Sequence, residues 1–417
     1  MIIKNLKNKI YKTLKNTEKL TGTDNVYIAK HGSYLTVGNI ISIITAFILS
    51  IAFARLLPKE TYGEYKYILS IFGLLALSSL SGINTAIVRG VAMGFDSVFK
   101  NGLLVKLKWS LLGSIASICL AIYFLIIGNS IFAISFLIIS IFLPFFKAGE
   151  AYQFYLSGKK LFKKKTTYTT ISQILSTILL IITLFLTKSL IILIFVYFAS
   201  YSILRILFSI LTINKYPSNK KNDPETISYG KHLSAIQILG LIANEADKIL
   251  LFFFLGPIQL AIYSFAALPI QHIQSPFQTI QELALPKFST QENGKIKKTL
   301  PKKLFKSIFF ISIIIIIYIF IAPYFFKIFY PQYLESIFYS QLLSLTLLVF
   351  PMSMMLLALL AKKKTKELYK ISIINPIFQI LLLILLVPSF GIIGIIIAKI
   401  ISQILYFFTT LYSFKKI

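Results

Sequence analysis

Three charged side chains lie close together in a segment that is otherwise apolar enough for the interior of a membrane. The segment LGLIANEADKILLFFFLGP, residues 239–257, contains Glu245, Asp247 and Lys248. Charged groups are rare in membrane-spanning helices, where they pair with one another or mark the route of an ion or a polar substrate. Glu245 and Lys248 are three residues apart and can pair on one helical face. Asp247 points elsewhere, so we expect it to meet a charge on another helix or the outer headgroups.

A stripe of amides follows in the next apolar segment. Its members are Gln271, Gln274, Gln278 and Glu282. Their spacing of i, i+3, i+7 and i+11 places them on one face of a helix, with His272 close to it. Amide and carboxylate groups can hydrogen-bond the hydroxyls of a sugar, so the stripe favours a polar cavity. An earlier segment carries Asn39 on a milder polar face, for which hydrogen bonding between helices is the alternative.

Other ionisable residues interrupt apolar segments elsewhere in the chain. The cations are Arg89, Lys147, Arg205 and Lys399, and Glu150 lies three residues after Lys147, within pairing distance on a helix. Arg89 and Arg205 lie towards the ends of their segments, where long side chains can reach the membrane surface. Four groups could couple transport to protons or sodium: Glu150, Glu245, Asp247 and His272.

The composition places these residues in a membrane. The chain of 417 residues is 57% hydrophobic and only 14% charged, with a mean hydropathy of +0.80. Apolar runs of about 20 residues, long enough to cross a bilayer as helices, recur throughout. We predict twelve spans: 33–54, 64–93, 104–127, 130–157, 167–186, 189–213, 230–255, 258–285, 304–326, 337–361, 368–388 and 391–412. The predicted fold is an all-α integral membrane protein.

The distribution of basic residues predicts the topology. With the amino terminus inside, 33 of the 43 Lys and Arg residues fall in the termini and the even-numbered loops, including Lys106 and Lys108. The odd-numbered, outer loops contain five: Arg55, Lys59, Lys66, Lys188 and Lys327. This skew indicates that both termini are cytoplasmic. The net charge of +29 is therefore explained by anionic inner-leaflet lipid, and no nucleic-acid partner is expected. Residues 1–31 have the pattern of an amphipathic helix on the cytoplasmic surface.

An internal repeat divides the chain into two halves. A shift of 198 residues lays residues 32–67 over 230–265 without a gap, so that Leu57 meets Leu255 and Tyr65 meets Tyr263. Two six-helix halves, 32–213 and 230–417, joined by the linker 214–229, are parallel repeats of the kind that transporters build around a central cavity.

The repeated segments also carry a family resemblance. Arg55, Pro58, Tyr62, Gly63 and Tyr65 follow the first span as AR-LL-P-x-x-x-Y-G-x-Y, and the seventh contains A-D-K followed by LGP. These patterns resemble the polysaccharide-exporter branch of the multidrug/oligosaccharidyl-lipid/polysaccharide (MOP) superfamily, which includes the Wzx-type O-antigen and capsule-repeat flippases. The first half departs from the family pattern where Pro58-Lys59 replaces a Gly-Pro pair.

The resemblance implies a flippase of the bacterial cytoplasmic membrane. Such proteins move undecaprenyl-pyrophosphate-linked sugar repeats across the membrane by alternating access, with other polysaccharide-assembly proteins as possible partners. A pyrophosphate needs positive charge along its route. The intramembrane cations are therefore the expected headgroup contacts, Lys147 and Lys248 foremost, with Arg89 at the cytoplasmic mouth, and Arg205 and Lys399 as further contacts.

Two other classes of function stay open. An ion-coupled drug or metabolite exporter of the same superfamily would share the topology, but one for organic cations should have a negatively charged cavity. A scaffold for glycan assembly would not need the amide stripe. The sequence contains no GxxxxGK[ST] loop, HExxH helix or nucleophile elbow, so we expect neither an enzyme nor a cofactor or metal. Cys119, the only cysteine, lies in an apolar span and can form no intrachain disulfide.

Overall fold

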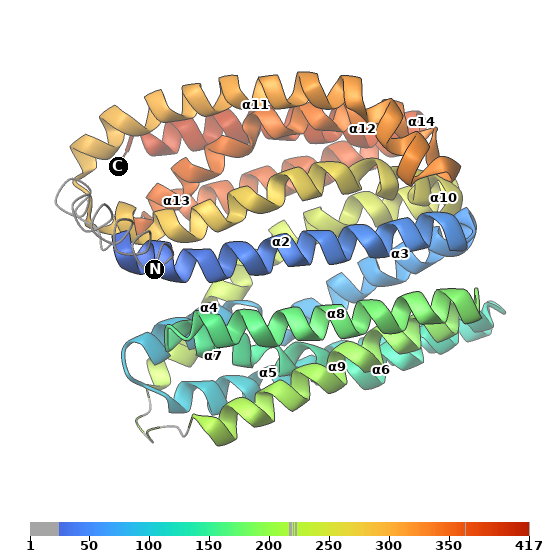
Figure 1. The fold of residues 1–417 in the computed structure, drawn as a ribbon, viewed down its shortest axis with the longest axis horizontal. Helices are drawn as coiled ribbons and strands as arrows, with labels where there is room; N and C mark the ends of the chain where they lie inside the picture. Colours follow the sequence, from blue (N-terminus) through green and yellow to red (C-terminus); the bar gives the residue numbers. More distant parts are fainter. Residues whose placement is uncertain (1–24, 217–218, 220, 222, 363, 417) are drawn as a thin grey trace, which may run out of the picture.

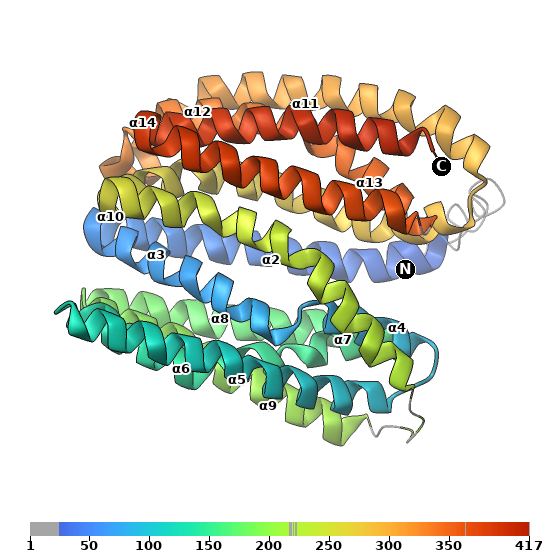
Figure 2. The same cartoon turned by 180° about the vertical axis from the view of Figure 1, so that it is seen from behind.

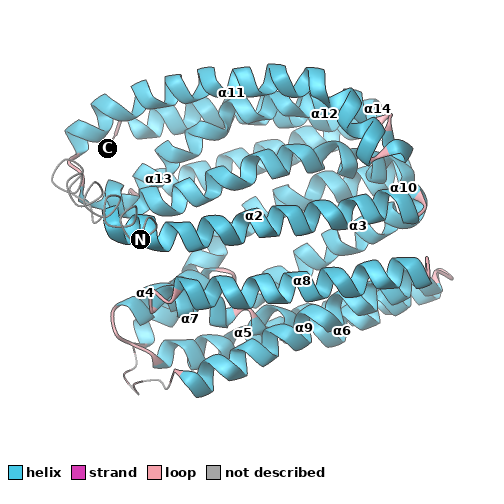
Figure 3. Cartoon of the chain, in the orientation of Figure 1, coloured by secondary structure: helices cyan, strands magenta, loops and turns pink. Residues whose placement is uncertain are grey.

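The described residues form helices joined by short turns, with no strand among them (Figure 3). The structure is a computed structural model, and it describes residues 25–216, 219, 221, 223–362 and 364–416. The first part contains α2 (Asn25–Leu56), α3 (Lys59–Leu75), η1 (Ala76–Ser79), α4 (Gly82–Ala92), α5 (Ser97–Ile126), α6 (Ser130–Gly149), α7 (Ala151–Gly158), α8 (Phe162–Leu186) and α9 (Leu190–Lys215). The second contains α10 (Pro224–Thr290), α11 (Asn293–Phe329), η2 (Pro331–Tyr333), α12 (Ser336–Ser344), η3 (Leu345–Met352), α13 (Ser353–Ala361) and α14 (Thr365–Phe414).

The surface of the helices is suited to lipid. Large apolar side chains such as Phe253, Phe305 and Leu186 are 76–80% exposed. Within hydrocarbon, a helix satisfies its own backbone hydrogen bonds, so these faces need no partner other than lipid tails. Nine helices in the described part of the chain are long and apolar enough to span a membrane, or ten if the pair Lys59–Ser79 and Gly82–Ala92, bent by 47°, forms one span. The protein is therefore a multi-pass integral membrane protein.

The two longest helices are each broken once. Gly256 in α10 has φ 81° and Gly391 in α14 has φ 56°, which glycine adopts without the steric cost that other residues meet. Each break lies where two predicted spans meet, at 255/258 and 388/391. It divides α10 into a first arm (224–255) and a second arm (257–290), and α14 into arms of residues 365–390 and 392–414. The count of twelve spans stays a prediction.

The helices form two groups with α2 and α3 between them. Helices α5, α6, α8 and α9 lie together in the lower group of Figure 1, and α11, α12, α13 and α14 lie in the upper group. Helix α10 begins beside α4 and crosses obliquely to lie along α14, as Figure 2 shows. The described N-terminal end of α2 and the C-terminal end of α14 lie at the same end of the molecule (Figure 1). The predicted amphipathic segment 1–31 falls mostly outside the described residues.

One sequence-based assignment is wrong. The count of basic residues assigned Lys106 to an inner loop, although it is the third residue of the predicted span 104–127. Helix α5 begins at Ser97, about two turns before that span, so Lys106 lies well inside the helix. The side chain of Lys106 is fully buried. It is a buried helix residue rather than a loop residue.

Candidate functional site

A charged cavity lies where α3, both arms of α10 and the second arm of α14 meet. Its volume is about 420 Å3. Five charged side chains line it: Lys66, Glu245, Asp247, Lys248 and Lys399. Three lysines face two carboxylates, so the formal charge of the lining is +1. The first half of the chain contributes Lys66, and the second half contributes the other four.

Asp247 anchors one side of this cavity. Its carboxylate is 1% exposed, and one oxygen lies 2.6 Å from the Lys399 ammonium. The Tyr263 hydroxyl donates a hydrogen bond to the same oxygen at 2.5 Å, and the backbone N–H of Lys248 donates to the other oxygen at 2.7 Å. Asp247 therefore meets a charge on another helix, one of the two outcomes expected from the sequence. This pair joins α10 to α14.

Glu245 and Lys248 form the predicted pair. The Lys248 ammonium lies 2.6 Å from a carboxylate oxygen of Glu245, and the two side chains remain 27% and 25% exposed. Lys66 lies on the facing helix α3, where its ammonium is 5.3 Å from the centre of the Tyr62 ring. The Glu245–Lys248 pair is accessible from the cavity, whereas the Asp247 carboxylate is closed off by its partners.

Part of the amide stripe lines an adjoining cavity. This bridging cavity of about 270 Å3 is lined by Gln271 and Gln274 and shares Lys399 with the charged cavity. Gln278 and Glu282 lie further along the second arm of α10, and their side chains fall outside the described residues. The structure thus places the first two members of the stripe next to the lysines.

Asn39 and His272 are engaged elsewhere. Asn39 donates to the Ser275 carbonyl at 3.3 Å and accepts from the Ser275 hydroxyl at 2.9 Å, which joins α2 to α10. His272 packs edge-on to the Phe47 ring, with 6.4 Å between ring centres. Neither residue lines the cavities described above. Asn39 therefore forms hydrogen bonds between two helices, which was the alternative to a place in a cavity.

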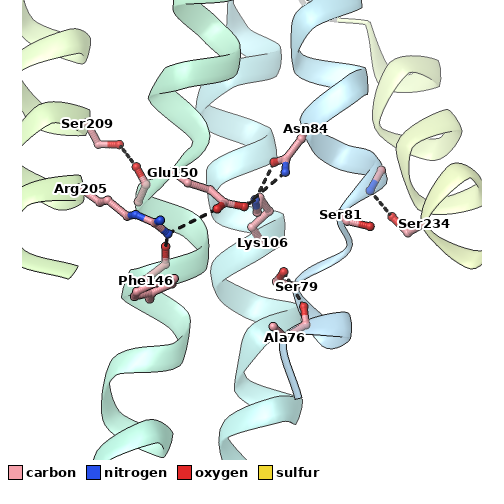
Figure 4. A network of polar contacts seen from close by, with 12 residues as sticks. Ala76, Ser79, Ser81, Asn84, Lys106, Phe146, Glu150, Arg205, Ser209 and Ser234 are labelled. Atoms are coloured by element: carbon pink, nitrogen blue, oxygen red, sulfur yellow. Dashed lines mark hydrogen bonds and ion pairs between the residues drawn. The ribbon is translucent and has the colours of Figure 1, made fainter. Parts of the chain in front are cut away.

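A second charged cluster lies in the first half of the chain (Figure 4). The buried Lys106 ammonium lies 2.9 Å from Glu150 and 2.6 Å from the side-chain oxygen of Asn84. Arg205 lies 3.4 Å from the other Glu150 oxygen and donates to the Phe146 carbonyl at 2.8 Å. Its guanidinium also stacks on the Phe146 ring, 3.9 Å from the centre. Glu150 is thus held by α5 and α9 together.

Lys147 and Arg89 occupy different surroundings from those two clusters. Lys147 does not form the salt bridge with Glu150 that its spacing permits. Lys106 and Arg205 bind the two oxygens of that carboxylate instead. The Lys147 ammonium lies 5.6 Å from the centre of the Phe72 ring. Arg89 is exposed on α4, with its guanidinium 5.0 Å from the Tyr229 ring at the start of α10. The headgroup roles of both stay predictions.

The Glu150 cluster yields a stability prediction. Glu150→Ala should destabilise the protein by about 3–5 kcal/mol, because Lys106 would be left buried without a carboxylate. The double variant Glu150→Leu/Lys106→Met removes the buried lysine together with its carboxylate and should recover part of that loss, while Arg205 loses Glu150 but keeps the Phe146 carbonyl. Thermal unfolding in detergent, followed by fluorescence, measures both. An unchanged transition for Glu150→Ala would show that the buried lysine does not depend on this partner.

Sequence reasoning missed four residues of these two clusters: Lys66, Tyr263, Lys106 and Asn84, whose side-chain oxygen accepts from the Lys106 ammonium. Lys66 was assigned to an outer loop and Lys106 to an inner loop, because both lie near predicted span ends. Tyr263 was noticed only as a partner of Tyr65 in the repeat, although a tyrosine within a span is itself a signal, since its hydroxyl needs a hydrogen-bond partner when buried.

The fold is that of a known class of membrane transporter. An outward-facing multidrug resistance MATE family transporter of the MOP superfamily is similar at 14% identity, with a TM-score of 0.60 over 93% of this chain and 96% of that one. An inward-facing MATE transporter has 13% identity and a TM-score of 0.66, over 90% and 95%. A MOP superfamily transporter from Pyrococcus furiosus, described as having a binding pocket of reverse polarity, has 13% identity and a TM-score of 0.62, over 93% and 96%.

The family follows from the sequence comparison. Residues 28–291 match the family model described as polysaccharide biosynthesis protein. The chain therefore belongs to the polysaccharide biosynthesis protein family, and its fold is that of MOP superfamily transporters. This confirms the resemblance to the polysaccharide-exporter branch. No curated protein matches the chain.

Proposed function

We propose that this transporter is a flippase that moves undecaprenyl-pyrophosphate-linked sugar repeats from the cytoplasmic to the outer leaflet by alternating access. The observation that supports this most is the charged cavity. Three lysines surround two carboxylates there, and amides line the adjoining space. An anionic headgroup attached to a hydroxyl-rich glycan requires these two surfaces side by side.

The exposure of the ion pairs suggests which cations bind the headgroup. Lys399 is held by the buried Asp247, and Arg205 is held by Glu150. Lys248 shares an accessible pair with Glu245, and Lys66 faces it across the cavity. Lys248 can therefore bind the substrate at the lowest cost by exchanging Glu245 for a pyrophosphate oxygen. Neither Asp247 nor Glu150 has to lose its partner in that exchange. Lys66 and Lys248 are the proposed headgroup residues.

The same exchange gives a route to ion coupling. When Lys248 turns to a pyrophosphate, Glu245 is left without its cation, and a proton or a sodium ion would then neutralise it. This exchange does not require Asp247 or Glu150 to leave the lysine and arginine partners that they have in the structure. Of the acids in the two clusters, Glu245 is the proposed coupling residue.

The proposed setting is the bacterial cytoplasmic membrane with both termini inside. The described start of α2, the end of α9, the start of α10 and the end of α14 lie at the same end of the molecule (Figure 1). The basic segments of the termini and this linker would then face anionic lipid of the inner leaflet. Other polysaccharide-assembly proteins of the same membrane are proposed partners.

The alternative is an exporter for organic cations. Such a protein should bind its substrate with surplus negative charge, whereas the described lining of the charged cavity has one surplus lysine. Reconstituted protein tests both functions in the same vesicles, by movement of an undecaprenyl-pyrophosphate-linked oligosaccharide and by uptake of a cationic dye. Dye uptake without movement of the lipid would establish the exporter.

Lys248→Gln is expected to slow lipid-linked sugar movement about tenfold or more, because a charge-assisted hydrogen bond to pyrophosphate contributes roughly 1.5–3 kcal/mol. Expression and thermal stability should stay near those of the unmodified protein, since the pair is partly exposed. Initial rates in vesicles measure the effect. Lys327→Gln, a change outside the cavity, is the matched control. Equal rates for both variants would remove Lys248 from the headgroup site.

A further inference from the structure

A third cavity lies within the second half of the chain and carries no charge on its described lining. Its volume is about 490 Å3, and the first arm of α10, α13 and both arms of α14 enclose it. The polar side chains that line it are Gln237, Asn244, Ser372, Asn375, Gln379, Ser402, Gln403 and Tyr406. Leu356 and Pro376 are among its apolar residues. We call this space the amide cavity.

The amide cavity continues into the two cavities already described. Asn244, Gln379 and Gln403 line both the amide cavity and the bridging cavity. Lys399 and Gln271 line both the bridging cavity and the charged cavity. The described lining thus passes from five charged side chains, through Lys399 alone, to none. The cavities form a series in which the number of charged lining residues falls, and Asn244 lines all three.

Four amides along this sequence have no hydrogen-bonding partner within the described residues. They are Asn244, Gln271, Gln274 and Gln403. Other amides in the bundle are used to join elements: Gln341 donates to the Ile319 carbonyl at 2.9 Å, and Gln173 donates to the Ser42 carbonyl at 3.0 Å. Asn244 and Gln271 are exposed and Gln274 and Gln403 are half-buried, so their side-chain amides are accessible from the cavities. The four free amides can obtain hydrogen-bonding partners from what fills the cavities.

Two further amides fix the walls of the amide cavity. Asn375 donates to Thr409 at 3.2 Å and so joins the two arms of α14. Gln379 donates to the Ala243 carbonyl at 3.3 Å and joins α14 to α10. The walls of the amide cavity are therefore joined without the four free amides. Those amides remain available to hydrogen-bond a ligand in the cavity.

We propose that the amide cavity is a subsite for the distal, uncharged sugars of the lipid-linked repeat, and that it discriminates against sugars that carry a carboxylate. This inference rests on the proposed flippase function. Amides can donate to and accept from sugar hydroxyls, while Tyr406 and the aliphatic residues suit the apolar faces of a pyranose ring. A uronate would find no cation on the described lining, and an unpaired charge in such a site is unfavourable. The pyrophosphate then lies at Lys66 and Lys248, and the glycan extends past Gln271 to Gln403.

The test compares two substrates that differ in one group. Vesicles with the full-length protein receive undecaprenyl-pyrophosphate trisaccharides with either three neutral hexoses or a uronic acid as the distal sugar. We expect the neutral lipid to move about tenfold faster or more. Gln403→Leu should slow the neutral lipid about fivefold, as expected for one lost hydrogen bond. Gln403→Lys should raise the rate of the uronate lipid relative to the neutral one.

The control is Gln341→Leu, which removes an amide that lines none of the three cavities, and it should leave the ratio of the two rates unchanged. Equal rates for the two lipids, together with an unchanged rate in Gln403→Leu, would overturn the sugar subsite while leaving the flippase intact. A faster rate in Gln403→Leu would also overturn it, because it would identify the cavity as a site for apolar groups. Failure of the folded, unmodified protein to move either lipid would overturn the proposed function itself.

Discussion

Asp247→Ala is expected to lower the free energy of unfolding by about 3–5 kcal/mol and to abolish transport. The substitution removes a carboxylate that is 1% exposed and that binds the Lys399 ammonium at 2.6 Å. It also removes the acceptor of the Tyr263 hydroxyl. Lys399 would be left within the membrane as an unpaired cation, which is the costly half of breaking such a pair. Thermal unfolding in detergent and lipid-linked sugar movement in vesicles measure the two effects.

A matched series separates the lost charge from the lost packing. Asp247→Asn keeps the shape and one acceptor oxygen, so its loss of stability should be smaller than that of Asp247→Ala. The double variant Asp247→Asn/Lys399→Met removes both charges and should recover most of the stability, as other buried pairs do when both partners become neutral. If Asp247→Ala unfolds at the same temperature as the unmodified protein, the pair does not hold α10 against α14.

The contrast between Asp247 and Glu245 explains what could be predicted from the sequence. Glu245 and Lys248 are three residues apart, and helical geometry alone brings them together. Asp247 and Lys399 meet only because α10 and α14 pack in one relative rotation, which depends on side-chain packing across the whole second half. Local periodicity contains no information on that rotation.

The same distinction applies to the ends of the helices. Hydropathy located the apolar segments, and the breaks at Gly256 and Gly391 lie where two predicted spans meet. The count of basic residues assigned Lys106 to a loop, because it lies at the start of the predicted span 104–127. Its partner Glu150 lies on another helix. A buried lysine can be recognised from the sequence only when its carboxylate is local.

The two charged clusters differ in how accessible their ion pairs are to a substrate. In the first half, Glu150 has Lys106 and Arg205 on its two oxygens, and Arg205 is also bound to a backbone carbonyl. In the second half, Asp247 is equally saturated, but the neighbouring Glu245–Lys248 pair is open to the cavity. A substrate can exchange partners with an open pair at much lower cost than with a closed one. This difference places the proposed headgroup site in the charged cavity rather than at Arg205 or Lys399.

In the proposed alternating-access mechanism, contacts at the end remote from the described termini must also separate. There, Lys59 at the start of α3 lies 3.1 Å from Glu335, just before α12, and Arg55 donates to the Ile328 carbonyl at 2.7 Å. Behind them, the Tyr62 ring packs on Phe265 with 4.6 Å between ring centres. The exposed ion pair alone contributes little to stability. The group of contacts joins the first half of the chain to the second.

Cross-linking these two positions is therefore expected to stop transport completely and reversibly. Lys59→Cys/Glu335→Cys, with the exposed Cys119 replaced by Ser, should react with a short bifunctional methanethiosulfonate and lose lipid-linked sugar movement, because a covalent tie prevents α3 from leaving α12. Dithiothreitol cleaves the tie and should restore the rate. Each single-cysteine variant treated with the same reagent should keep its activity, which separates the tie from simple modification. Full activity of a protein shown by mass spectrometry to be cross-linked would mean that this end does not open during transport, and the alternating-access mechanism would have to be replaced by one in which substrate leaves sideways between the helices.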